Sequence, residues 1–353
     1  MPLYDRIADL PLEIGAYGLE GRNRQVNPEF ERVTTTIHLE GGDHEGLGED
    51  VTYDPDQQRS QQARGPVLPL AGHWTFGAFC HHVGGLDLFA GEEPSMPAFR
   101  NYRRWAYESA ALDLALRQAG TTLAAALGRE PEPISFVVSL RLGEPPSTDP
   151  VTRRVAAYPG TRFKLDSSPA WDDAFLAALA ETGAVAAIDF KGAYKGTIVD
   201  TPTDPDLYRR CAEAFPDAWL EDPDLTVPEA DAALAPHRDR ITWDAPIHGV
   251  ADIEALPFPP RTINVKPSRI GPVAEVLRAY EWCAERGIQT YGGGQSELGV
   301  GRGQIQYLAS LFHPHEPNDI APSGYDWLDF PETGLAPSPL PPDLDGTGFR
   351  RRS

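Results

Sequence analysis

The sequence predicts an α/β protein in which an α+β segment precedes a parallel β-barrel. Up to about residue 130, the chain mixes runs of alternating polarity with helical patterns. From about Pro133 onward, eight short apolar runs alternate with amphipathic helical stretches. Eight strands that alternate with helices favour a closed parallel barrel over an open sheet. A chain of 353 residues can hold a barrel of about 200–250 residues and a smaller domain.

The first segment is expected to contain a pair of strands followed by helices. Residues 32–41 and 46–54 alternate in polarity on either side of a glycine-rich turn, which is typical of two adjacent strands. Residues 99–120 carry apolar side chains at three- and four-residue spacing and end at Gly120, which predicts a helix.

The second segment supplies the barrel strands. Most of its apolar runs end in a polar or charged residue, as expected where strands reach the mouth of a barrel. From about Pro331 the chain is rich in proline, and we expect it to follow an irregular path over the surface. The eight runs cover residues 134–142, 161–166, 184–192, 218–223, 241–246, 262–268, 287–294 and 318–324.

Charge and composition exclude several classes of partner. A net charge of -21 argues against nucleic acid and acidic membranes, which need a positive surface. No run approaches the roughly 20 apolar residues that cross a bilayer, and residues 1–15 lack the features of a signal peptide. The three scattered cysteines fit reduced thiols better than a disulfide framework or a zinc site, so we expect a cytoplasmic protein.

Charged residues occupy matching places at the ends of five successive runs. Their separations are 25, 32, 23 and 22 residues, each about one strand and one helix. Residues at matching strand ends converge at the carboxyl-terminal mouth of a barrel, where barrel active sites lie. The spacing therefore places three carboxylates side by side with a lysine at each end of the row. The five residues are Lys164, Asp189, Glu221, Asp244 and Lys266.

Three adjacent carboxylates repel one another and need a cation to hold them together. Hard oxygen ligands suit Mg²⁺, with Mn²⁺ as a substitute, and no cluster of histidines and cysteines offers softer ligands in the sequence. We therefore predict that Asp189, Glu221 and Asp244 bind Mg²⁺.

Lysine is scarce in this chain, which makes the surviving lysines informative. Of 31 basic residues only four are lysine. Lysine can give up its proton near neutral pH, whereas arginine cannot. Near a dication in a partly dry pocket the pKa of an ammonium falls, so Lys164 and Lys266 are predicted to act as an acid/base pair from opposite faces of a substrate. Lys195 is interpreted as a surface residue.

Several motifs resemble those of the enolase superfamily, in particular its muconate-lactonizing-enzyme-like branch within the mandelate racemase/muconate lactonizing enzyme family. The lysine pair excludes the mandelate-racemase pattern, in which a His–Asp pair replaces the second lysine. The matching segments are Arg162-Phe163-Lys164 for K-x-K, Asp189 for the first metal Asp, Glu221-Asp222-Pro223 for Glu-x-Pro, Asp244 with Ile247 and Asp252, Lys266 to Gly271 for K-x-x-x-x-G, Gln295-Ser296-Glu297-Leu298-Gly299 for E-S-x-x-G, and Gly46-Leu47-Gly48-Glu49 with Ala111-Leu112-Asp113-Leu114 in the cap.

The resemblance implies a fold, a division of the chain and a reaction. The fold is a modified TIM barrel, (β/α)₇β, at residues 133–330, with an N-terminal α+β capping domain at residues 1–132 that is completed by the tail at 331–353. The reaction is Mg²⁺-dependent removal of the proton beside a substrate carboxylate through an enediolate. Relatives are often symmetric oligomers, which leaves a homo-oligomer open for this chain.

Three functions are compatible with this resemblance. The leading hypothesis is racemisation or epimerisation of a small-molecule carboxylate such as an N-acylated amino acid. The alternative is β-elimination or cycloisomerisation of the o-succinylbenzoate synthase or muconate cycloisomerase type. A non-catalytic binding module with the same fold is a remote alternative.

The chain departs from the family pattern at several positions. Arg162 keeps a charge but cannot titrate, Lys191 replaces an asparagine, Ala245 replaces a glutamate, and Gln295 replaces the glutamate of E-S. Lys191 either reaches into the pocket to bind an anion or pairs with a neighbouring acid. No D-x-D motif stands at residues 318–322, which disfavours a dipeptide substrate. The resemblance makes Arg162, Lys191, Gln295 and Ser296 candidates for contact with the substrate or its developing charge.

A loop of the cap is expected to close the mouth of the barrel near residues 17–25. This stretch carries Arg22 and Arg24, which could clamp a second carboxylate or a phosphate, or could be two solvated surface arginines.

Overall fold

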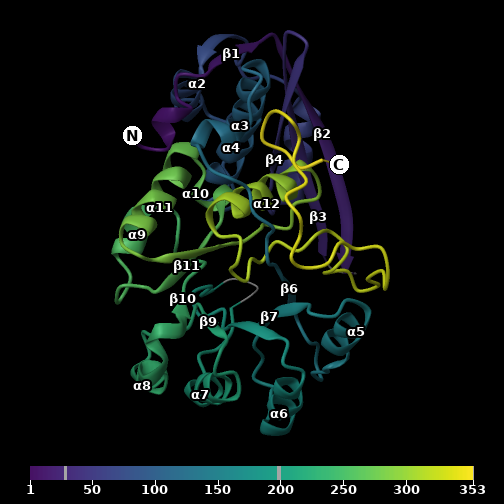
Figure 1. Cartoon of the computed structure of the whole chain (residues 1–353), viewed down its shortest axis with the longest axis vertical. Helices are drawn as coiled ribbons and strands as arrows, with labels where there is room; N and C mark the ends of the chain where they lie inside the picture. The colour runs from purple at the N-terminus through teal and green to yellow at the C-terminus, as the bar shows by residue number, and fades with distance from the viewer. Residues whose placement is uncertain (28–29, 197–199, 353) are drawn as a thin grey trace.

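The structure, a computed structural model, describes residues 1–27, 30–196 and 200–352. It combines an α+β cap with a barrel of parallel strands, as the sequence predicts (Figure 1). Figure 1 shows α2 (Phe76–Gly84), α3 (Phe99–Gln118) and α4 (Leu123–Leu127) toward one end of the molecule, and α6 (Asp173–Glu181), α7 (Pro205–Ala214) and α8 (Pro228–Leu234) at the other.

The cap contains a three-stranded antiparallel sheet in the order β2-β3-β4, with helix α3 packed on it. Gly46 and Gly48 of β4 permit this close packing: an added Cβ would lie 2.2 Å from the carbonyl oxygen of Ala110 and 2.0 Å from that of Ala106. A separate strand pair joins β1 and β5. The cap elements are η1 (Tyr4–Arg6), β1 (Pro11–Ile14), β2 (Ala16–Asn27), β3 (Phe30–Gly41), β4 (His44–Asp50), α1 (Pro55–Arg64), β5 (Gly72–Thr75), α2 (Phe76–Gly84), α3 (Phe99–Gln118) and α4 (Leu123–Leu127).

The barrel consists of two groups of parallel strands joined by single backbone contacts. Five strands pair in the order β10-β9-β8-β7-β6, and β11 pairs with β12. The backbone N–H of Asn264 donates to Trp243 at 2.9 Å and so links β11 to the end of β10. The strands are β6 (Val137–Leu140), β7 (Arg162–Asp166), β8 (Val185–Asp189), β9 (Trp219–Glu221), β10 (Ile241–Thr242), β11 (Thr262–Val265) and β12 (Gln289–Gly292).

The barrel closes through its eighth predicted run. Single β-bridges join Phe136 to Asn318 and Gly293 to Asp319, so residues 318–319 lie between the first and seventh barrel strands. The eight predicted runs thus all lie in the barrel wall, although the last forms two bridges rather than a regular strand.

Helices follow the barrel strands, and α6 and α7 begin at side-chain caps. The Asp172 carboxylate accepts a hydrogen bond from the N–H of Phe175 at 2.8 Å, and Asp204 caps α7, which has Pro205 at its start. The remaining helices are α5 (Asp149–Ala157), α6 (Asp173–Glu181), α7 (Pro205–Ala214), α8 (Pro228–Leu234), η2 (Ala235–Arg240), α9 (Val250–Glu254), α10 (Pro267–Ile270), α11 (Val273–Glu285) and α12 (Val300–Phe312).

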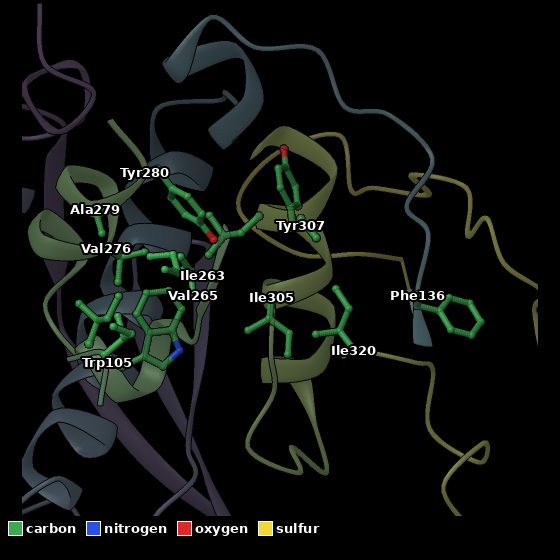
Figure 2. Close-up of a cluster of buried hydrophobic side chains, with 14 of the residues drawn as sticks. Trp105, Phe136, Ile263, Val265, Val276, Ala279, Tyr280, Ile305, Tyr307 and Ile320 are labelled. Carbon is green, nitrogen blue, oxygen red and sulfur yellow. The ribbon is translucent and has the colours of Figure 1, made fainter. Parts of the chain in front are cut away.

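One hydrophobic core continues from the cap into the barrel. Figure 2 shows Trp105 of α3 in the same buried cluster as Ile263 and Val265 of β11 and Ile305 of α12. Burying such side chains stabilises the fold by roughly 1.5–3 kcal/mol each. Shared burial of this kind couples the position of the cap to that of the barrel.

The C-terminal tail is irregular, as predicted, but it is held firmly at its end. Phe349 is fully buried, with its ring centroid 6.4 Å from that of Trp105 and 5.5 Å from that of Tyr307. Arg350 donates to the buried Asp113 of α3 at 2.5 Å. The tail therefore contributes to the packing of α3 against α12.

The expected closing loop at residues 17–25 is wrong, because these residues form part of strand β2. They pair with β3 in register from Tyr17 opposite Leu39 to Gln25 opposite Glu31. Gly21 permits a close approach rather than a turn, since an added Cβ would lie 2.5 Å from the side-chain oxygen of Gln62. In the described part of the chain, no helix has the length and apolar character needed to span a membrane.

Candidate active site

Three buried carboxylates meet where β8 and β9 end. Asp189, the last residue of β8, pairs in register with Glu221, the last residue of β9, and Asp222 follows directly. One oxygen of each lies within 4.8 Å of the others. Their position at the mouth of parallel strands agrees with the sequence prediction for Asp189 and Glu221. These three residues, the acid trio below, could hold a metal ion through hard oxygen ligands.

Asp222 completes this group of three, whereas Asp244, which the sequence predicts as the third ligand, lies beyond the end of the next strand. The backbone of Asp222 is left-handed, with φ of +48°, a conformation that costs a non-glycine residue about 1–3 kcal/mol. Its carboxylate accepts hydrogen bonds from the N–H groups of Asp244 at 2.8 Å and Ala245 at 2.9 Å. Asp222 thus fixes the end of the neighbouring strand. The sequence signal that could have identified Asp222 as a site residue was its position inside the Glu-x-Pro motif.

Two members of the trio have raised pKa values, whereas at Asp189 the effect of burial is outweighed by Lys191 and Lys164, which lower its pKa. Burial and the nearby negative charges of Asp244 and Asp189 raise the pKa of Asp222 to about 7. Burial also raises the pKa of Glu221 well above its usual range, although Lys164 opposes this. A bound cation would relieve this repulsion, so the donor set fits a divalent metal ion.

Lys164 of β7 places its ammonium group against the trio. Its side chain is buried, and Nζ contacts Glu221, lies 3.2 Å from Asp189 and lies 3.5 Å from Asp319. Burial alone would lower the pKa of Lys164, but these carboxylates raise it well above its ordinary value. The lowered pKa expected from the sequence depends on a nearby dication, and without one the carboxylates beside Lys164 raise its pKa instead.

Asp244 and Lys266 form a second buried group at the ends of β10 and β11. Nζ of Lys266 lies 2.8 Å from Oδ2 of Asp244, and Nη1 of Arg269 lies 2.6 Å from Oδ1. Tyr194 donates its hydroxyl to Asp244 at 3.2 Å. Burial opposes ionisation of Asp244, but Arg269 and Lys266 hold its pKa below the usual range. Arg269 was missed in the sequence, although it lies within the K-x-x-x-x-G motif.

Lys191 pairs with acids, which is one of the two alternatives left open by the sequence. Its backbone is left-handed, with φ of +55°, and its N–H donates to Asp189 at 3.0 Å. Nζ also contacts Asp189 and lies 3.2 Å from Asp166. Burial lowers the pKa of Lys191, but Asp166 and Asp189 raise it well above its ordinary value.

Two further site residues come from strands that are not adjacent to their partners in the barrel, and they were missed. The hydroxyl of Tyr291, on β12, donates to Glu221. Asp319, on the eighth run, approaches Lys164. Neither residue stands in a motif, and only closure of the barrel brings them next to β7 and β9.

Arg162, Arg22 and Arg24 have partners outside the acid trio. Arg162 is exposed and donates to the carbonyl of Val185 at 3.2 Å, so the sequence interpretation of it as a substrate contact is not supported by its position. Arg22 pairs with Glu20 at 3.2 Å, whereas the Arg24 guanidinium lies 4.0 Å from the ring centre of Trp327. The two arginines therefore do not form a fork on one anion.

Gln295 and Ser296 are held by the cap. The side-chain amide of Gln295 donates to the hydroxyl of Tyr102 at 3.0 Å. The buried guanidinium of Arg32, on β3, donates to the carbonyl groups of both Gln295 and Ser296. It also donates to the carbonyl groups of Val33, Val51 and Thr52.

A cap carboxylate, that of Glu49, binds residues that lie just after Gln295 and Ser296 in the chain. Glu49 of β4 is buried and accepts hydrogen bonds from the N–H groups of Leu298 at 2.8 Å, Gly299 at 3.0 Å and Gly301 at 2.8 Å. An anion at the N-terminus of α12 is favourable because the helix dipole is positive there. Arg32 and Glu49, the cap clamp below, thus fix the barrel segment that follows β12.

A cleft of about 470 Å³ opens beside the trio at the ends of β6, β7 and β8. Arg141 follows β6, Asp166 ends β7 and is followed by Ser167, and Lys191 follows β8. Nε of Arg141 lies 2.9 Å from Asp166. Lys191 lines the cleft and also contacts Asp189, so its side chain lies between the cleft and the trio.

Comparison with known proteins agrees with this fold. The chain matches the models "Domain of unknown function (DUF8230) N-terminal domain" at residues 5–126 and "Domain of unknown function (DUF8230) C-terminal domain" at residues 130–327. Among solved structures, an enolase superfamily member from Listeria innocua has a TM-score of 0.63 and 20% identity, covering 88% of this chain and 86% of that chain. Muconate cycloisomerase from Pseudomonas fluorescens has a TM-score of 0.60 and 20% identity, covering 85% of this chain and 83% of that chain.

Curated relatives fall into two activities. An o-succinylbenzoate synthase from Geobacillus stearothermophilus is 29% identical over 235 residues, which span 64% of this chain and 60% of that protein. An N-succinylamino acid racemase from Thermus thermophilus is 27% identical over an alignment of 359 positions, which covers 98% of this chain and 92% of that protein.

Proposed function

The chain belongs to the DUF8230 family and, by its fold, to the enolase superfamily, and from this we propose that it removes the proton beside a substrate carboxylate. The observation that carries the proposal is the pair of buried lysines, Lys164 and Lys266, beside the carboxylates at the mouth of the barrel. We propose residues 1–132 with the tail 331–353 as the cap and residues 133–330 as the catalytic barrel.

Asp189 and Glu221 are the proposed ligands of Mg²⁺, with Mn²⁺ as a substitute. Asp244, predicted from its strand end, and Asp222, which lies in the trio, are the two candidates for the third ligand. When bound, Mg²⁺ would supply positive charge to stabilise a substrate carboxylate whose negative charge increases on deprotonation.

The chain's own groups would then move the proton. Lys164 and Lys266 extend from strands β7 and β11, which lie on different sides of the acidic row. One lysine would remove the proton from the carbon, and the other, as an ammonium, would return a proton to the opposite face. Without a metal ion, the neighbouring carboxylates raise the pKa of Lys164 and so favour its ammonium form.

The proposed substrate is an N-succinylamino acid, and the proposed reaction is its racemisation. The relatives named as racemases act on N-succinylamino acids, and the synthases are named for a product that carries a succinyl group, so a succinyl-bearing carboxylate is common to both. The second candidate is β-elimination of the o-succinylbenzoate synthase type, supported by the identity to those synthases. We further propose that the substrate is a small molecule and that the protein is cytoplasmic. We also propose that it forms a homo-oligomer.

Mass spectrometry in D₂O tests the proposal. The protein with Mg²⁺ is incubated with pooled N-succinyl-L-amino acids, N-succinyl-D-amino acids and other chiral carboxylates. Gain of one deuterium without another mass change is the expected result. Loss of water would favour the elimination reaction, and absence of exchange from every pool, with Mg²⁺ bound, would contradict the proposed chemistry.

A further inference from the structure

The cleft beside the acid trio is lined by a buried hydroxyl group, that of Ser167, without a hydrogen-bond partner among the described residues. Ser167 is 8% exposed. Buried polar groups without partners are uncommon in native proteins and call for an explanation. Because Ser167 lines the cleft, a ligand oxygen is a suitable acceptor or donor for it.

Lys191 is the cation that the cleft shares with the trio. Its ammonium group divides its contacts between Asp189 in the trio and Asp166 in the cleft. A dication on Asp189 would replace the positive charge that Lys191 now supplies there. The ammonium would then be left with Asp166, which Arg141 already pairs at 2.9 Å.

With Asp189 held by a dication, Lys191 and Arg141 would share the single carboxylate of Asp166, which leaves N–H groups of both cations for a ligand. Glu144 and Asp200 also line the cleft, but each has a donor of its own. Glu144 accepts a hydrogen bond from Ser168 at 3.4 Å, and Asp200 accepts one from the N–H of Gly196 at 2.8 Å. The donors that a ligand in the cleft can engage are therefore Ser167, whose Oγ has no partner among the described residues, and Lys191 and Arg141, which share Asp166.

We propose that this cleft binds a second carboxylate of the substrate, remote from the reacting carbon, through Lys191 and Ser167 with Arg141 at its outer edge. The inference rests on the proposed function, since a succinyl group supplies such a carboxylate. This site would give a role to Lys191, which stands where the family pattern has an asparagine. When a dication binds Asp189, the Lys191 ammonium would be available to bind the remote carboxylate of the substrate.

Isothermal titration calorimetry of the Mg²⁺-loaded protein tests this role with two probes. N-succinylglycine carries the second carboxylate, and N-acetylglycine lacks it. The expected result is at least about tenfold tighter binding of N-succinylglycine, the size of one charged hydrogen bond. Lys191→Met is expected to reduce this preference to about twofold or less, and Ser167→Ala to reduce it partially. The matched control is Lys195→Met, because Lys195 is a nearby lysine outside the cleft lining, with Nζ 3.0 Å from Asp224 and 3.8 Å from Asp200.

Equal binding of the two probes, binding of neither, or a preference that survives Lys191→Met would each overturn the inference. Deuterium exchange on N-acetyl- and N-succinylalanine separates this failure from failure of the proposed function. Exchange of both substrates at equal rates would leave proton abstraction standing and overturn the remote-carboxylate site. A binding preference lost in Lys191→Met without exchange from either substrate would support the site and contradict the proposed reaction.

Discussion

The ammonium nitrogen of Lys266 lies 2.8 Å from Oδ2 of Asp244. Lys164 contacts a different carboxylate, that of Glu221, from a strand elsewhere in the barrel wall. The two lysines therefore have separate partners, and each can be replaced without removing the other's contact.

Replacing these lysines one at a time should separate their roles. In a two-base racemase, Lys164→Met and Lys266→Met should each abolish α-proton exchange from one stereoisomer, with a loss of about 10²–10⁴-fold, the usual contribution of a positioned acid or base. Exchange is measured by mass spectrometry on each N-succinylamino acid enantiomer in D₂O. Equal loss from both enantiomers with each variant would instead indicate a single base and favour the elimination reaction.

The third metal ligand can be identified by comparing two aspartates. Asp189→Asn should abolish Mg²⁺ binding at millimolar concentration, whereas loss of a residue that only orients a ligand weakens binding about 10–100-fold. Calorimetry on Asp222→Asn and Asp244→Asn decides between the candidates, because the true ligand should show the larger loss. Unchanged affinity in all three variants would place the metal elsewhere.

Lys191→Asn should strengthen Mg²⁺ binding by about tenfold, because it removes an ammonium that competes for Asp189. In the absence of metal the same variant should unfold about 1–3 kcal/mol more easily, since Asp189 loses a buried partner. Calorimetry and urea unfolding, with and without Mg²⁺, measure the two effects. Weaker metal binding in this variant would show that Lys191 supports the ion rather than competing with it.

His313 should make stability depend on pH. Burial lowers the pKa of His313 from its ordinary value of 6.5 to about 4. As the pH falls, His313 is protonated in the unfolded chain before it is protonated in the folded protein. The stabilisation that comes from keeping His313 neutral is therefore complete above pH 6.5 and is lost progressively down to about pH 4. Near pH 4.5 the loss amounts to about 2.5 kcal/mol. Urea unfolding of the wild type and His313→Gln at about pH 7 and pH 4.5 should show a smaller pH effect in the variant; identical pH effects would contradict the assignment.

The cap clamp should contribute to stability through its charged groups. Glu49→Gln keeps the size of the side chain but removes the charge that three backbone N–H groups of the α12 start now share. We expect a loss of about 1–3 kcal/mol in the free energy of unfolding, measured in urea. Glu45→Gln, at an exposed site on the same strand, is the control and should change stability by less than about 0.5 kcal/mol.

The barrel and most of its charged row could be predicted because each depends on local pattern. Apolar runs mark the strands, and one charged residue per strand end marks the mouth, so Lys164, Asp189 and Glu221 were placed together from spacing alone. Contacts across the barrel could not be predicted in this way. Tyr291 and Asp319 reach β9 and β7 only because the eighth run closes the barrel, and nothing in their local sequence signals that contact.

The wrong loop at residues 17–25 has a similar cause. This stretch contains glycines and many polar residues, so it lacks the apolar alternation by which strands are recognised. It becomes a strand because β3 offers a complete row of backbone partners. The identity of the third carboxylate in the trio was likewise decided by backbone geometry, namely the left-handed turn at Asp222.

The burial of Phe349 has a consequence for how the protein is made. A ribosome releases the chain from its N-terminal end, and domains usually fold in that order. Here the cap residue Trp105 cannot complete its packing until Phe349, synthesised 244 positions later, has emerged to lie against it. The part of the protein that is translated first is therefore finished last, and a nascent chain that stops short of residue 349 carries an open cap core for a chaperone or protease to recognise.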